Sequence, residues 1–188
     1  MNDVAAARAP GANGLVALDW WNGNRSVLVD GELSGLLVGM TLETDAVDIY
    51  RALLESTAYG MREVVEAFVR SGVGISVVHM SGGISRKSPL LMQIYADVLG
   101  RPVHASQTEL GPALGSAIYG AVASGAHSSI GEAAEAMGDR HEIVYEPAEH
   151  GREVYDELYS EFSTLHDYFG RGQNEVMKRL RRIRAAVR

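Results

Sequence analysis

The fold is decided by residues 75–100, ISVVHMSGGISRKSPLLMQIYADVLG, which have the pattern of a strand, a glycine turn and a helix. The β-branched run over 75–78 is typical of a buried parallel strand. Gly82 and Gly83 end it with a turn that has no Cβ atoms, so a ligand can approach the backbone. Small ligands bind beyond the carboxyl ends of strands in open α/β sheets, so the turn predicts a nucleotide wall, with plain chain reversal as the alternative.

A helix is expected directly after this turn. Ser88 offers an N-cap oxygen, Pro89 suits the first helical position, and Gly100 suits the C′ position. Apolar residues recur with helical spacing at Leu91, Met92, Tyr95, Ala96 and Leu99. The stretch is neither a Walker A loop nor a Gly-x-Gly-x-x-Gly dinucleotide fingerprint.

Composition indicates a protein with one domain and a bulk surface that is a poor match for nucleic acid or anionic membranes. The chain has 188 residues, 46% of them hydrophobic, and a net charge of -7. It contains no cysteine, which excludes disulfides and thiolate metal sites. With no long apolar run and no signal-peptide core, we expect a cytoplasmic location.

Strand and helix patterns alternate along the chain, which predicts an α/β fold. The apolar run over 35–42 predicts a strand covered on both faces, and Thr44 or Asp45 can cap the long helix after it. A second short strand is expected over 102–105. Further helices are expected over 111–125, 130–137 and 153–169, and a turn over 145–147.

The two ends differ in composition from the middle. Residues 1–13 are small and polar and predict a flexible leader, and residues 14–170 predict the folded domain. Residues 171–188 form a basic helical tail on an acidic protein. We expect that tail to be a solvated terminal helix, with contact to an acidic partner or to nucleic acid as the alternatives.

Both tryptophans lie in one unusual loop. Trp20 and Trp21 stand beside Asn22, Asn24 and Arg25. Adjacent indoles with a forked guanidinium favour a loop that lines a cleft or locks an interface. A turn packed on the core by its tryptophans is the alternative.

Other catalytic chemistry has little support in the sequence. The six histidines include no His-x-x-x-His pair, so no metal ligand is assigned. No Gly-x-Ser-x-Gly elbow is present. Asp19 and Asp97 are single carboxylates, interpreted as a turn residue and a helix-face residue.

Four blocks in order resemble the C-terminal half of the FGGY carbohydrate kinases. They are GLVALDWWNGNRS at 14–26, GLLVGMT at 35–41, GGISRKSPLLMQIYADVLG at 82–100 and ALGSA at 113–117. Within that family the tryptophan loop and the Gly-Gly-Ile-x-Arg-Lys run most resemble the L-ribulokinases. The resemblance implies an actin-like (ribonuclease H-like) ATPase fold, of which this chain is the C-terminal lobe with the first strands missing.

The resemblance also implies site residues. Family members close two lobes over ATP and sugar and transfer the γ-phosphoryl group with Mg2+, which the nucleotide and the other lobe mainly hold. Residues 113–117 would begin the interdomain helix, and the loop 20–25 would face the cleft. By the match, Gly82 and Gly83 would pass beneath the adenosine and phosphates, with Ile84, Arg86, Lys87 and Ser88 around the adenine.

The family's first lobe, with the general base and most of the sugar site, would lie before Met1. We therefore expect the chain alone not to phosphorylate L-ribulose, the first lobe being required for this step of L-arabinose catabolism. An unpaired sheet edge predicts a homodimer or association with a separate N-terminal half. The alternative is a non-catalytic remnant that binds nucleotide or a protein partner.

Overall fold

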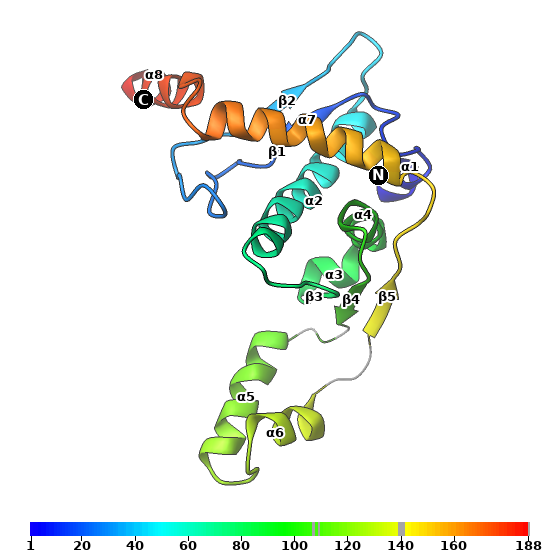
Figure 1. The fold of residues 1–188 in the computed structure, drawn as a ribbon, viewed down its shortest axis with the longest axis vertical. Helices are drawn as coiled ribbons and strands as arrows, with labels where there is room; N and C mark the ends of the chain where they lie inside the picture. Colours follow the sequence, from blue (N-terminus) through cyan, green and yellow to red (C-terminus); the bar gives the residue numbers. More distant parts are fainter. Residues whose placement is uncertain (107, 109, 139–141, 188) are drawn as a thin grey trace.

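Three long helices form the body of the structure, which is a computed structural model (Figure 1). They are α2 (Ala46–Arg70), α4 (Pro89–Leu99) and α7 (Arg152–Gly170), and each packs against the other two. The structure describes residues 1–106, 108, 110–138 and 142–187. Within that part of the chain, no helix is long and apolar enough to cross a membrane.

The long helix α2 begins where its capping residue predicts. Asp45 accepts hydrogen bonds from the N–H groups of Val47 and Asp48 at 2.8 and 2.9 Å, and the Asp48 carboxylate accepts the Asp45 N–H at 3.0 Å. This reciprocal pair is a capping box, which satisfies backbone donors that the helix leaves free. The expected caps of α4 are also present, with Ser88 before Pro89 and Gly100 in the left-handed conformation.

Residues 1–13, which their composition predicts to be a flexible leader, make specific contacts with α2 in the structure. They contain α1 (Asn2–Ala6), which packs against α2 and buries Ala5 completely. Arg8 forms ion pairs with Asp45, at 2.6 Å, and with Asp48. The capping carboxylates of α2 therefore also hold the start of the chain, a long-range role that composition cannot reveal.

A buried polar network ties α1 and α7 to α2. Arg51 donates to Glu55 at 2.8 Å, to the Ala5 carbonyl at 2.7 Å and to the Tyr155 hydroxyl at 3.0 Å. Glu55 is fully buried and also accepts a hydrogen bond from Asn13 at 3.3 Å. Burial raises the pKa of Glu55, and the charge of Arg51 opposes that rise.

The strand expected over 35–42 is shorter and more exposed than predicted. β2 (Leu36–Val38) pairs antiparallel with β1 (Val16–Leu18), in a register that places Val16 opposite Val38. β1 is buried between α2 and α7, whereas Val38, Met40 and Leu42 are exposed. The prediction of a strand covered on both faces was wrong for this structure, because no residue of β2 is fully buried and Val38 is exposed.

A second sheet joins three strands in the order β3 (Val78–Met80), β4 (Val103–Ser106) and β5 (Glu142–Tyr145). β3 and β4 are parallel, and β4 and β5 are antiparallel. β3 starts at Val78 rather than Ile75, and β5, which the sequence did not predict, ends at Tyr145, where the expected turn over 145–147 begins. The buried residues Val103 and Ala105 pack against α4 on one face of this sheet.

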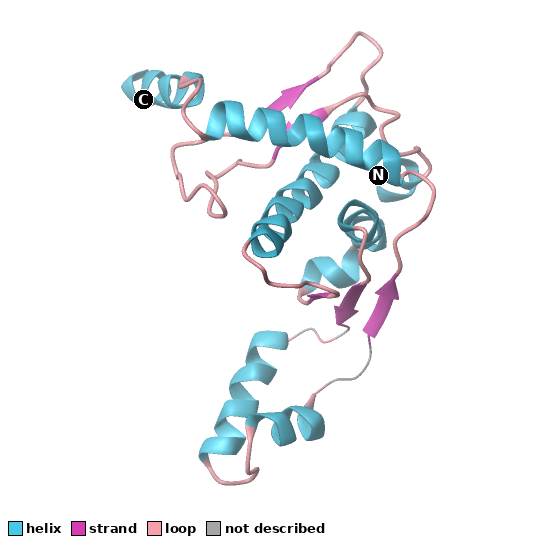
Figure 2. Ribbon diagram, viewed as in Figure 1, coloured by secondary structure: helices cyan, strands magenta, loops and turns pink. Residues whose placement is uncertain are grey.

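Residues 111–137 form two helices at one end of the molecule in Figure 2, and the C-terminal helix lies near the other end. The predicted helices α5 (Gly111–Ala123) and α6 (Ile130–Met137) pack on each other, and α5 buries none of its residues. The basic tail forms α8 (Val176–Val187), which is anchored rather than fully solvated. Met177 is buried, and Lys178 pairs with Asp30 at 2.9 Å.

Candidate functional site

The glycine turn leaves bare backbone between β3 and α3 (Gly83–Lys87). Gly82 has φ 101° and ψ -177°, a conformation essentially restricted to glycine. A Cβ atom at Gly82 or Gly83 would meet no heavy atom within 4 Å. Ser85 is buried, and its hydroxyl donates to the Gly82 carbonyl at 2.8 Å. The backbone over this turn is therefore both locally fixed and open to a ligand.

The side chains that follow the turn are mostly exposed. Ile84 is 66% exposed, and Arg86 and Lys87 are also exposed. Ser88 is half-buried, and its hydroxyl accepts the Leu91 N–H at 3.4 Å as the cap of α4. An apolar side chain and two cations beside uncovered backbone can contact a purine ring and anionic phosphates.

The tryptophan loop lines a pocket of about 540 Å³, a size that suits a small ligand. All five predicted loop residues, Trp20, Trp21, Asn22, Asn24 and Arg25, contribute to its lining. The opposite wall comes from α2 and α4 and consists of Thr57, Gly60, Met61, Val64 and Tyr95. None of the residues 82–88 lines this pocket, so the structure does not bring the two predicted sets together in one cavity.

The two tryptophans have different surroundings, so each interpretation of the loop describes one of them. Trp20 is 1% exposed and meets the ring of His166 edge-on, with 5.4 Å between ring centroids. Trp21 is 57% exposed, and its ring lies where a Cβ atom of Gly35 would be, at 2.1 Å from the nearest ring carbon. Trp20 thus packs the loop on the core, and Trp21 faces the pocket.

Backbone hydrogen bonds close the loop behind the tryptophans. Asn24 and Asp30 exchange two backbone hydrogen bonds of 2.9 Å each, and the Asn24 side chain accepts the Leu28 N–H at 3.0 Å. Gly23 has φ 80°, and a Cβ there would lie 2.7 Å from the Gly31 Cα. Asn24 is therefore buried for structural reasons, whereas Asn22 and Arg25 are exposed and available to a ligand.

Asp19 is a pocket residue that the sequence did not single out as functional. Its carboxylate lies over Gly60, where an added Cβ would be 2.7 Å from Oδ2. Burial raises the pKa of Asp19, an effect that a backbone hydrogen bond and the nearby His166 oppose. Burial likewise raises the pKa of Tyr95 on the opposite wall. Asp19 is thus a partly desolvated carboxylate that can accept hydrogen bonds from a hydroxylated ligand.

The pocket wall opposite the tryptophan loop has a helical spacing that is visible in the sequence. Thr57, Gly60, Met61 and Val64 follow one another at intervals of three, one and three residues, which places them on one stripe of α2. That stripe includes Gly60, a residue that weakens a helix but leaves room for Asp19. Which loop would face the stripe depends on long-range packing, so the sequence alone could not join the two walls.

Comparison with known proteins gives a consistent result. Residues 1–124 match the model of the FGGY family of carbohydrate kinases, C-terminal domain. A ribulokinase of Geobacillus thermodenitrificans is 49% identical over 188 residues, and one of Mycolicibacterium smegmatis is 48% identical over 185. Each alignment covers 98% of this chain but only 33% and 32% of the relative, so the chain spans about one third of their length.

Solved structures show the same relationship at the level of the fold. The xylulose kinase of Rhodospirillum rubrum aligns with a TM-score of 0.72 and 33% identity, over 88% of this chain and 33% of that one. The ligand-bound xylulose kinase of Lactobacillus acidophilus aligns with a TM-score of 0.76 and 19% identity, over the same shares. The predicted α/β fold of a sugar-kinase C-terminal lobe is confirmed, and the chain belongs to the FGGY family of carbohydrate kinases.

Proposed function

We propose that this chain is the nucleotide-binding C-terminal lobe of a kinase that transfers the γ-phosphoryl group of ATP to L-ribulose. The observation that carries the proposal is the 49% identity to a ribulokinase over nearly the whole chain. The open backbone at Gly82 and Gly83, with Arg86 and Lys87 beside it, supports a role in binding ATP. Residues 14–170 would form the lobe proper, and residues 171–188 its basic tail.

The chain's own residues would bind and orient the nucleotide. The backbone at Gly82 and Gly83 would pass beneath the adenosine and phosphates. The side chains around the adenine would be those of Ile84, Arg86, Lys87 and Ser88. Mg2+ would neutralise charge on the transferring phosphoryl group, held by the phosphates and by the other lobe. Phosphoryl transfer depends mainly on positioning and charge neutralisation, so a second wall that closes on ATP suits this chemistry.

A titration of the chain with Mg-ATP tests nucleotide binding. We expect Gly83→Trp to weaken binding at least tenfold, because the indole would occupy the open space above the turn. Gly74→Trp is the matched control, since Gly74 is also exposed, has no positive φ and has open space around its Cβ position. Equal affinity of the two variants would contradict the proposal, and no binding by the wild-type chain would favour a partner-binding remnant.

A second assay addresses catalysis and assembly. The relatives are about three times as long as this chain, and the general base is proposed to lie in the part that the chain does not match. The 188 residues alone should not phosphorylate L-ribulose, whereas mixing them with the N-terminal two thirds of a ribulokinase should restore turnover. Full turnover by the chain alone would contradict the proposal that the general base lies outside this chain. Light scattering would distinguish a monomer from the proposed homodimer or two-part assembly, and cell fractionation would test the proposed cytoplasmic location.

A further inference from the structure

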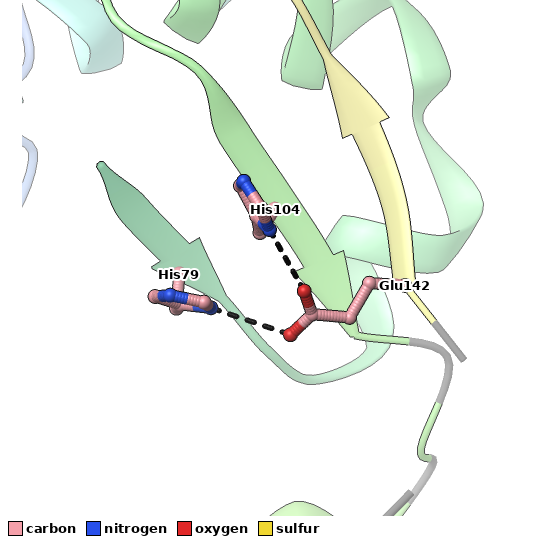
Figure 3. Close-up of side chains that lie close together, drawn as sticks. All are labelled: His79, His104 and Glu142. Atoms are coloured by element: carbon pink, nitrogen blue, oxygen red, sulfur yellow. Dashed lines mark hydrogen bonds and ion pairs between the residues drawn. The ribbon is translucent and has the colours of Figure 1, made fainter. Parts of the chain in front are cut away.

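Two histidines and a glutamate meet on the face of the second sheet that points away from α4. The parallel register places His79 of β3 opposite His104 of β4, so both side chains leave the same face. On β5, Val144 is opposite His104, and Glu142 lies two residues away on that same face. Three adjacent strands therefore direct these side chains toward one point, as Figure 3 shows.

The three side chains are already close enough to chelate one ion. Nδ1 of His79 is 3.3 Å from one Glu142 carboxylate oxygen, and Nδ1 of His104 is 2.8 Å from the other. One ligand atom from each residue can be chosen so that all three lie within 4.8 Å of one another. Ligand atoms about 2.1 Å from a tetrahedral zinc ion are about 3.4 Å apart, so binding needs only small side-chain movements.

The backbone beneath the three side chains is held by the core. Val103 and Ala105, the neighbours of His104 in β4, are fully buried against α4. The chelating face itself is open, since the His79 side chain is 62% exposed and those of His104 and Glu142 are 28% and 32% exposed. An ion can therefore enter from solvent and retain a coordination position for water or another ligand.

The donor set selects the class of ion. Imidazole nitrogens suit zinc, copper, nickel and cobalt, whereas Mg2+ and Ca2+ prefer oxygen ligands. A plain hydrogen-bonded cluster of two histidines and a carboxylate is the competing explanation. The direction of both Nδ1 atoms toward one carboxylate fits either explanation, so the decision rests on whether an ion binds there.

We propose that His79, His104 and Glu142 form a binding site for a divalent transition-metal ion of the zinc class, with at least one coordination position left open. The bound ion would link β3, β4 and β5 at a point three residues before Gly82. It is distinct from the Mg2+ that accompanies ATP and does not depend on the proposed kinase function.

Zinc titration by calorimetry and Co2+ absorption spectroscopy on the full 188-residue chain test the site. We expect one Zn2+ per chain and a visible Co2+ spectrum typical of four or five ligands that include nitrogen. His104→Ala and Glu142→Gln should each weaken Zn2+ binding about 100-fold, because even changes outside the first ligand shell cost 10–100-fold. His150→Ala is the matched control, since His150 is an exposed histidine outside the cluster, and it should bind as the wild type does.

The His79→Ala variant separates loss of metal binding from loss of the fold. It is expected to fold normally, because the His79 side chain is the most exposed of the three. This variant should keep the wild-type circular dichroism spectrum while losing the Co2+ spectrum. Zinc should raise the thermal midpoint of the wild type and not that of His79→Ala. Zinc binding that is equal in the wild type and all three cluster variants, or no binding at 100 μM zinc, would overturn the proposal.

Discussion

Replacing Arg51 by methionine should cost the domain about 3 kcal/mol of unfolding free energy. Arg51 is 4% exposed and donates to Glu55, to the Ala5 carbonyl and to the Tyr155 hydroxyl. Removing one partner of a buried ion pair costs about 3–5 kcal/mol, because the other charge stays buried without compensation. We expect the lower end of this range, since Glu55 would still accept hydrogen bonds from Asn13 and Tyr155.

Urea unfolding monitored by tryptophan fluorescence measures this loss. With a denaturant slope of about 2 kcal/mol/M, a loss of about 3 kcal/mol lowers the midpoint by about 1.5 M. Arg171→Met is the matched control, because Arg171 also pairs with a carboxylate one helical turn away, at 2.7 Å, but is half exposed. Such a surface pair contributes about 0.5 kcal/mol or less.

The pH dependence of the Arg51→Met variant gives an independent check. Burial already raises the pKa of Glu55, and loss of the arginine charge removes the main opposing effect. A carboxyl group whose pKa is raised in the folded state stabilises the fold at low pH. That contribution to stability is lost as the pH rises above the group's pKa in the unfolded chain, which is about 4.3. The variant should therefore lose less stability at pH 5 than at pH 8. A loss no larger than that of Arg171→Met, or one that is the same at both pH values, would refute the role given to this network.

Two further substitutions test the pocket and the start of the chain. Gly35→Ala should displace the Trp21 ring, which lies 2.1 Å from the new Cβ position, and shift tryptophan emission to the red; Gly31→Ala, with open space around its Cβ position, should leave the spectrum unchanged. An identical spectrum for both variants would contradict the position of Trp21. Asp45→Ala should lower the thermal midpoint, because Asp45 caps α2 and pairs with Arg8. Hydrogen bonds from the Asp48 backbone and from Arg8 lower the pKa of Asp45, so its contribution is present above about pH 3.9 and is lost as the pH falls. A difference from the wild type that persists unchanged at pH 2.5 would argue against this cause.

The sequence correctly predicted helix ends and the glycine turn, because these features depend only on neighbouring residues. Asp45, Ser88 and Gly100 mark the ends of α2 and α4 because caps act within one helical turn. The glycine turn at 82–83 follows from the same kind of local rule. These positions therefore needed no knowledge of the remaining fold.

Features that depend on distant residues could not be predicted in this way. α1 packs on α2, and Asp19 lines the pocket because it faces the Gly60 stripe. The His79, His104 and Glu142 cluster depends on the registers of three strands, and the sequence predicted no strand over 142–145. Short strands of three or four residues carry too little periodicity to define such registers.

Amide hydrogen exchange with and without Mg-ATP tests most directly whether the bare turn is the nucleotide wall. We expect added protection to concentrate in residues 82–88, because the nucleotide would cover backbone that is open in the structure. Gly83→Trp should abolish that protection, and Gly74→Trp should retain it. Protection confined to the tryptophan loop 19–26, or none at 82–88 at saturating Mg-ATP, would contradict the account.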